Sequence, residues 1–431
     1  MNLFWEHLGL NYNFHPKLIE LAIEAEKAAA PEFKELVPVV QTNQLRVLAA
    51  FQEAGISEFH LKDGTGYGYG DLGREGLEAV YALTFGTEAA LVRAQIISGT
   101  HAIALALSSL LNPGDELLSA TGRPYDSLAQ VIGIPYARRG SLKDRGINYR
   151  EVPLTPEGLP DYQKIKAAIT ERTRVVLIQR SRGYSWRKSL SVQEIGNLIK
   201  FLKDANQELI CFVDNCYGEF VEAREPTHVG ADLAAGSLIK NPGGGLAPSG
   251  GYLVGKRELI GDAADRLIAP GLGNKIGTNL GLGRLFYQGL FMAPQIVGEA
   301  LKGAIFASHF FTLLGFETSP LPGSPRSDLV QALKLNSPEG VKAFCRGIQA
   351  ASPIDSRAVP VSSLLPGYQD PIIMAAGTFI QGASLELSAD APLRPPYIVY
   401  VQGGLSYVHI LFGLLKAAQE LVNEGLACLQ N

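Results

Sequence analysis

The chain has 431 residues, of which 46% are hydrophobic and 19% are charged, and its formal net charge is −4. This length and composition predict a globular protein of two or three domains and exclude an intrinsically disordered chain. The small negative charge gives no basis for binding nucleic acid or an anionic membrane surface.

The N-terminal sequence, MNLFWEHLGLNYNFHPKL, has no basic region followed by an apolar core, so we expect no secretion signal. The apolar runs are short or interrupted by glycine and charge, which argues against a membrane span. The four cysteines form no CxxC pair, and Cys211 and Cys216 lie in or beside an apolar run. This pattern favours buried thiols in a reducing compartment, so we expect a cytoplasmic protein.

Helix is predicted for residues 1 to about 50. Segments 17–29 and 39–55 both carry apolar residues at helical spacing, and Gly55 can end the second helix. Residues 1–55 are therefore expected to form an N-terminal helical arm. The pattern leaves open whether this arm packs on its own large domain or on a partner subunit.

A glycine-rich stretch, GTGYGYGDLGREG, contains a formal GxGxxG at Gly68, Gly70 and Gly73. This spacing occurs in dinucleotide-binding proteins, where the glycines follow a buried strand. The preceding FHLKDGT is a poor strand, and Tyr67 and Tyr69 would crowd a pyrophosphate group. A loop that presents two tyrosines fits better, and a nicotinamide-dependent oxidoreductase is the alternative.

Regular alternation of predicted strands and helices begins at residue 88, which predicts a large domain over residues 56–300. A capping box, Ser191 with Glu194, begins one helix. Strands separated by helices predict a mostly parallel sheet covered on both faces, and the nearby segment 251–256 is expected to be an antiparallel neighbour. The predicted strands are 91–98, 116–121, 175–180, 209–215 and 234–240, with helices at 99–111 and 125–134.

Beyond residue 300 the pattern changes. A helical segment, 300–317, precedes a stretch rich in proline, serine and glycine and then short segments that alternate between strand and helix. This arrangement predicts a smaller C-terminal α+β domain over residues 301–431 that closes over the first. The fold class is therefore α/β.

Two apolar runs end in charged residues, the first in Asp214 and the second in Lys240. If both runs are buried parallel strands, the two charges meet at the carboxyl edge of the sheet, where α/β proteins bind their ligands. A lysine and an acid suit pyridoxal phosphate (PLP), because the lysine forms a Schiff base and the acid keeps the pyridine nitrogen protonated. Taken alone, each of the two residues is more simply explained as the end of a strand. The occurrence of both together favours a PLP site.

Ser98, Gly99, Thr100 and His101 lie between a predicted strand and a predicted helix. The N–H groups of a helix start, with neighbouring hydroxyls, form a phosphate site, although ordinary capping by Ser98 or Thr100 is the common alternative. His101 can stack on a cofactor ring or form a hydrogen bond at the helix start. Ser237, near the end of the second apolar run, could reach the same phosphate or could simply be a small packing residue.

Four more residues face the predicted ligand edge or follow it. Tyr125 begins a helix, where an aromatic ring can cover a bound ring or simply pack. Arg394 precedes the last strand, and a guanidinium suits a substrate carboxylate. Arg180 and Arg182 follow the third strand and are candidate substrate or cofactor ligands.

The chain resembles the fold-type I PLP enzymes of cystathionine and methionine metabolism, and most closely the branch of aluminium-resistance and methionine γ-lyase-like proteins. The resemblance is strongest over residues 98–128, 179–195, 212–220 and 236–255. It implies an aspartate-aminotransferase-like fold with a seven-stranded sheet. It also implies a small amino-acid substrate, and a homodimer or homotetramer whose active sites are shared between subunits.

The resemblance implies a role for each matching residue. Lys240 would form the Schiff base, Asp214 would contact the pyridinium, and Arg394 would hold the substrate carboxylate. Phosphate contacts would come from Gly99, Thr100 and Ser237.

The sequence departs from the family pattern in three places. Tyr67 or Tyr69 resembles a tyrosine that reaches the phosphate from the neighbouring subunit, but the local pattern differs. The usual Asn-Pro after the third strand is replaced by the segment 180–183, which leaves the contact to the ring hydroxyl open. The stacking tyrosine is displaced, so Tyr125 and His101 are rival candidates.

The implied activity is that of a carbon–sulfur lyase of methionine γ-lyase type, which releases a 2-oxo acid, ammonia and a thiol. Lys240 would remove the Cα proton if its pKa falls well below its free value. The alternatives are a cystathionine β- or γ-lyase, an aminotransferase, or a PLP-fold binding protein without turnover. No metal-ligand cluster accounts for a link to aluminium.

Overall fold

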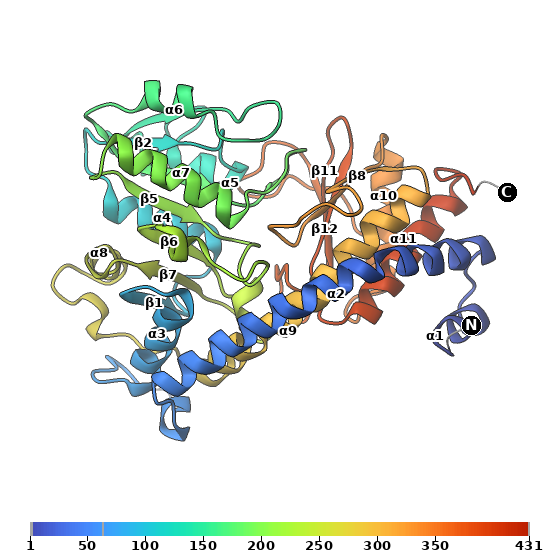
Figure 1. Ribbon diagram of the computed structural model, residues 1–431, viewed down its shortest axis with the longest axis horizontal. Helices are drawn as coiled ribbons and strands as arrows, with labels where there is room; N and C mark the ends of the chain where they lie inside the picture. Colours follow the sequence, from blue (N-terminus) through green and yellow to red (C-terminus); the bar gives the residue numbers. More distant parts are fainter. Residues whose placement is uncertain (1–2, 63, 430–431) are drawn as a thin grey trace. The chain divides into compact units, whose positions relative to one another are not determined.

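The protein is described by a computed structural model that covers residues 3–62 and 64–429 (Figure 1). It comprises two compact units. The large unit contains residues 41–183 and 187–294, and the small unit contains residues up to 40, 184–186 and those from 295 onward. The domain limits at residues 55 and 300 stay predictions.

The large unit is built on a seven-stranded sheet with the order β1-β7-β6-β5-β4-β2-β3. Strand β7 pairs antiparallel with β6 and β1, and the remaining pairs are parallel, so the predicted mostly parallel α/β sheet and its antiparallel neighbour are confirmed. The strands are β1 (Ala89–Arg93), β2 (Glu116–Ser119), β3 (Asn148–Glu151), β4 (Thr173–Gln179), β5 (Ile210–Asp214), β6 (Leu233–Ser237) and β7 (Gly251–Gly255).

Helices cover both faces of this sheet. Helices α4, α5 and α8 share one apolar cluster with alternate strand residues such as Leu253. On the opposite face, Tyr81 and Phe85 of α3 pack against the ring of Tyr252. The helices are α3 (Leu72–Phe85), α4 (Gly99–Leu110), α5 (Asp126–Ile132), α6 (Tyr162–Ala168), α7 (Val192–Ala205) and α8 (Arg257–Leu267), with short 3₁₀ turns η1 (Glu58–Leu61), η2 (Pro226–Val229), η3 (Asn241–Gly243) and η4 (Gly273–Lys275).

The small unit contains an antiparallel five-stranded sheet of order β10-β11-β12-β9-β8. Its apolar core joins α10 and α11 to this sheet and to the N-terminal helices. The elements are α1 (Leu3–Asn11), β8 (Glu317–Ser319), β9 (Gln331–Lys334), α10 (Pro338–Ala350), β10 (Ile372–Ala375), β11 (Ser388–Pro392), β12 (Ile398–Gln402) and α11 (Tyr407–Asn423).

Two long helices have residues in both units. The two predicted N-terminal helices form one, α2 (Pro16–Glu53), which continues through Pro31 and Pro38. Both prolines are on its exposed side, so each costs local hydrogen bonding without disturbing the buried stripe. Helix α9 (Gly283–Leu313) is, within the described residues, the one helix that is long and apolar enough to cross a membrane by length and composition. Since 67% of its most apolar window is buried inside the protein, the helix also fits a core position.

Candidate active site

The carboxyl ends of β5 and β6 bring the predicted acid and lysine together. Strand β5 ends at Asp214, which pairs with Ala235 of the parallel neighbour β6. Strand β6 ends at Ser237, and Lys240 follows three residues later. The two charged groups interact electrostatically, since Lys240 lowers the pKa of Asp214 and Asp214 raises that of Lys240. The edge position predicted from the strand pattern is therefore present.

The amine of Lys240 lies in an enclosed setting. Its Nζ is 3.9 Å from the centre of the Tyr217 ring, and a Cβ added at Gly99 would lie 3.8 Å from it. Burial lowers the pKa of Lys240, but the neighbouring acidic groups of Cys216, Tyr217 and Asp214 raise it by more. The net effect is a pKa of Lys240 well above its ordinary value. The protein chain by itself therefore favours the charged amine, whereas removal of the Cα proton requires the free amine.

Asp214 is almost completely buried and contacts Cys216. The backbone N–H of Cys216 donates to Oδ1 of Asp214 at 3.2 Å. Burial raises the pKa of Asp214, while the charge of Lys240 and hydrogen bonding from Cys216 oppose that rise. Sequence reasoning gave Cys216 no site role, although its place two residues after the acid was a usable signal.

The start of α4 and the end of β6 form a small polar cradle. A Cβ at Gly99 would lie 3.5 Å from the Cβ of Ser237, so the two segments meet closely. The buried Ser237 Oγ has no hydrogen-bond partner among the described residues. Ser98 caps the helix by accepting the N–H of His101 at 3.1 Å, which is the ordinary capping that the sequence left open.

Tyr125 and His101 lie in different surroundings. The Tyr125 hydroxyl is 3.3 Å from Thr100 Oγ1, and burial, followed by the charge of Asp214, raises the pKa of Tyr125. His101 accepts the N–H of Ile97 through Nδ1 at 3.3 Å, and burial lowers its pKa. Of the two rivals, Tyr125 is the one coupled electrostatically to Asp214 and Lys240.

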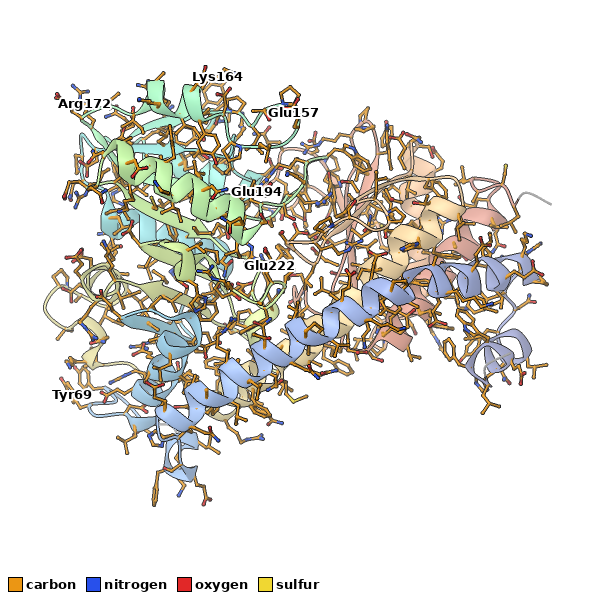
Figure 2. The ribbon with its side chains drawn as sticks, viewed as in Figure 1. Tyr69, Glu157, Lys164, Arg172, Glu194 and Glu222 are labelled. Atoms are coloured by element: carbon orange, nitrogen blue, oxygen red, sulfur yellow. The ribbon has the colours of Figure 1, made fainter. Side chains whose placement is uncertain are left out.

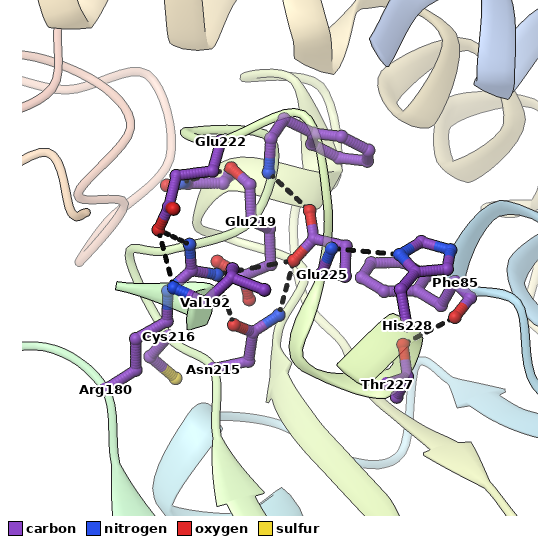
Figure 3. Close-up of polar contacts among 12 residues, drawn as sticks. Phe85, Arg180, Val192, Asn215, Cys216, Glu219, Glu222, Glu225, Thr227 and His228 are labelled. Carbon is purple, nitrogen blue, oxygen red and sulfur yellow. Dashed lines mark hydrogen bonds and ion pairs between the residues drawn. The ribbon is translucent and has the colours of Figure 1, made fainter. Parts of the chain in front are cut away.

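The three predicted arginines are placed differently. Arg180 is fully buried in a polar network of the large unit, where its Nη2 donates to Glu222 at 2.9 Å (Figure 3). Arg182 is also buried in that unit. Arg394 belongs to the small unit, where it is exposed and forms an ion pair with Asp370 at 2.8 Å.

The glycine-rich stretch is a loop that leads into α3. It follows a 3₁₀ turn and not a strand, so the structural context of a dinucleotide fingerprint is missing from this part of the described chain. The rings of Tyr67 and Tyr69 stack 5.5 Å apart and are 67% and 70% exposed. Figure 2 shows Tyr69 at the margin of its unit. The stretch therefore forms the loop presenting two tyrosines that the sequence favoured over a dinucleotide-binding site.

Glu219 is a buried acid that the sequence analysis missed. The Tyr252 hydroxyl donates to its Oε1 at 2.7 Å, and its Oε2 has no partner within the described chain. A Cβ at Gly236 would lie 2.5 Å from Oε1, so only glycine leaves room for the carboxyl group. Burial raises the pKa of Glu219 to about 8, and the group is therefore mostly protonated at neutral pH.

Replacing Glu219 with glutamine is expected to change how stability depends on pH. The pKa of about 8 in the folded protein exceeds the ordinary 4.5, so this group's contribution to stability is complete below about pH 4.5 and is lost as pH rises to about 8. The loss is at most about 1.4 kcal/mol per pH unit. Urea unfolding followed by circular dichroism should show a flatter pH profile for Glu219→Gln than for wild type. The exposed Glu208→Gln is the control, and equal slopes in all three proteins would contradict the assignment.

A family comparison agrees with this geometry. The model for methionine gamma-lyase matches residues 18–422. The chain belongs to the methionine gamma-lyase family. Its cofactor is pyridoxal 5′-phosphate, as predicted.

Two of three individual relatives match nearly the whole chain, and the third matches about half of it. The uncharacterised protein YnbB of Bacillus subtilis (strain 168) is 50% identical, over 96% of this chain and 98% of its own length. The crystal structure of a carbon-sulfur lyase involved in aluminium resistance from Clostridium novyi NT has a TM-score of 0.92 and 47% identity, covering 96% of this chain and 98% of that one. L-methionine gamma-lyase of Pseudomonas putida is 29% identical over 47% of this chain and 45% of its own.

The residues at the sheet edge fit the family's cofactor. A buried serine hydroxyl without a partner and a helix start with glycine suit a phosphate group. The buried carboxylate of Asp214 suits a protonated ring nitrogen, and the amine of Lys240 suits an aldehyde. Within the described residues no group of three or more His, Cys, Asp or Glu side chains could hold a metal ion.

Proposed function

We propose that this protein is a carbon–sulfur lyase that cleaves a sulfur amino acid to a 2-oxo acid, ammonia and a thiol, in the manner of methionine gamma-lyase. The observation that carries the proposal is the meeting of Asp214 and Lys240 at one sheet edge beside the cradle of Gly99 and Ser237. Family membership supports the same chemistry. The related structure from Clostridium novyi NT is described as a carbon-sulfur lyase.

The chain's own residues divide the work in this proposal. Lys240 attaches the cofactor and later takes the proton from the substrate Cα, while Asp214 keeps the ring nitrogen protonated. Gly99, Thr100 and Ser237 hold the phosphate, with the start of α4 contributing its N–H groups. Pyridoxal phosphate, when bound, supplies a sink for the negative charge that proton removal leaves.

Further ligands are proposed around this centre. Tyr125 is favoured over His101 as the aromatic group beside the ring, because Asp214 and Lys240 both influence its pKa. Arg394 is proposed to bind the substrate carboxylate, for which a guanidinium has the matching geometry. Arg182 is retained as a candidate ligand.

The assembly and compartment are also proposals. Tyr67 or Tyr69 would reach the phosphate of a neighbouring subunit, which requires at least a homodimer and allows a homotetramer. Their exposure in the single chain supports this role. We place the protein in the cytoplasm.

The absorption spectrum of the purified protein and ammonia release from three substrates test the proposal. A visible band from bound cofactor is expected, together with ammonia and a 2-oxo acid from methionine, cystathionine or cysteine. Preference for cystathionine would indicate a β- or γ-lyase of that substrate, and formation of pyridoxamine would indicate an aminotransferase. A bound cofactor without any 2-oxo acid would contradict the lyase and favour a binding protein.

A further inference from the structure

Tyr217 lies against the amine on which the proposed chemistry depends. The Nζ of Lys240 is 3.9 Å from the centre of the Tyr217 ring, close enough for the ring face to attract an ammonium group. The two residues come from different loops, one after β5 and one after β6. Their contact is thus made by the tertiary structure.

The backbone of Tyr217 is in an uncommon conformation. Its φ is +69°, in the left-handed region that bulky side chains rarely adopt, and Phe220 nearby has φ +62°. Backbone of this kind persists where the surrounding structure fixes it, and it is concentrated at functional sites. Contacts from other parts of the large unit must therefore hold the loop around Tyr217 in this conformation.

Arg180 supports the loop from beneath. A Cβ added at Gly218 would lie 2.5 Å from Cδ and Nε of Arg180, so the glycine backbone rests directly on the arginine side chain. The guanidinium in turn donates to Asn215 Oδ1 at 2.8 Å and to Glu222 Oε1 at 2.9 Å, on either side of Tyr217 in sequence (Figure 3).

Glu225 binds the same loop through further hydrogen bonds. Its Oε1 accepts the N–H of Phe220 at 2.8 Å, and its Oε2 accepts Asn215 Nδ2 at 3.1 Å and pairs with Arg180 at 3.4 Å. The side chains of Arg180 and Glu225 are both fully buried. Contacts on both sides of Tyr217 therefore fix a backbone that its own side chain disfavours.

We propose that Tyr217 is a positioning residue for Lys240: its ring face holds the amine and favours the charged form, and the loop of residues 215–225, anchored on Arg180, keeps the ring in place. The inference rests on the proposed function, because it concerns how that amine is presented. A tyrosine that merely filled space would not require the left-handed backbone or the buried anchor.

The test measures how fast pyridoxal 5′-phosphate associates with the apoprotein, as a function of pH, in Tyr217→Leu and Tyr217→Phe. The reacting species is the free amine, so removing the ring should lower the midpoint pH and raise the free-amine fraction about two- to thirtyfold. Phenylalanine keeps the ring face and removes only the hydroxyl, so the midpoint of Tyr217→Phe should fall by less than that of Tyr217→Leu. An unchanged midpoint in folded Tyr217→Leu would overturn the proposal.

Two further variants make the result decisive. Arg180→Lys should shift the midpoint in the same direction by less, and no shift would refute the support by Arg180. If Tyr217→Leu does not fold, Tyr217→Met and then Arg180→Lys replace it. Lys240→Ala separates the two proposals: a visible band that survives in it contradicts the proposed function itself, whereas its loss beside an unchanged Tyr217→Leu contradicts only the role of Tyr217.

Discussion

Lys240→Ala should lose the visible absorption band of bound pyridoxal phosphate and should release no measurable ammonia from sulfur amino acids. Lys240 is the lysine at the edge formed by β5 and β6, where Asp214 influences its charge. Removing it deletes the covalent attachment and the group that takes the Cα proton. Proton transfer alone accounts for about a 10²- to 10⁴-fold effect on rate, and loss of attachment adds to it.

Lys200→Ala is the matched control for this experiment. Lys200 is exposed on α7, where it forms an ion pair with Asp204 at 2.7 Å. It should keep both the band and the activity of wild type. An intact band in Lys240→Ala, or an equal loss in Lys200→Ala, would show that the lysine has been misassigned.

The position of Asp214 and Lys240 at the sheet edge could be predicted, because it follows from short apolar runs in the sequence. Asp214 and Lys240 each end an apolar run, and parallel pairing of neighbouring strands necessarily brings their carboxyl ends together. The capping box at Ser191 was equally readable, since the Ser191 hydroxyl accepts the Glu194 N–H three residues ahead. Strand β3 (Asn148–Glu151) was missed because its residues alternate between exposed and partly buried positions and form no apolar run.

The supports of the site could not be predicted, because they depend on contacts between distant segments. Arg180 was expected to be a candidate ligand from its position after β4, and only the fold shows its guanidinium enclosed by Glu222 and Glu225, 42 and 45 residues later. Glu219 becomes a neutral acid because the fold buries it, and the hydrogen bond from Tyr252 of β7 opposes that rise in its pKa. The left-handed backbone at Tyr217 has no sequence signature, since the residue type disfavours it.

Glu225→Ala should destabilise the protein by about 3–5 kcal/mol, because it leaves the Arg180 guanidinium buried with one ion-pair partner fewer. The side chains of both residues are completely buried, and Glu225 also accepts the Phe220 N–H. Urea unfolding of the apoprotein measures the loss as a lower midpoint. Disturbance of the loop should also move the pH midpoint of cofactor association, as is expected for Arg180→Lys.

Two further variants test whether the buried charge of Arg180 is the cause of the stability loss in Glu225→Ala. Glu222, with 27% of its side chain exposed, also binds Arg180, and Glu222→Ala should cost only about 1.5 kcal/mol because water can reach the site. The double variant Arg180→Met with Glu225→Leu removes both charges and should recover much of the stability lost in Glu225→Ala, since apolar groups of similar size can replace a buried ion pair. If the double variant is no more stable than Glu225→Ala, the loss comes from the missing hydrogen bonds to the loop. In that case the ion pair of Arg180 and Glu225 stabilises the protein by fixing the loop conformation, and not by compensating a buried charge.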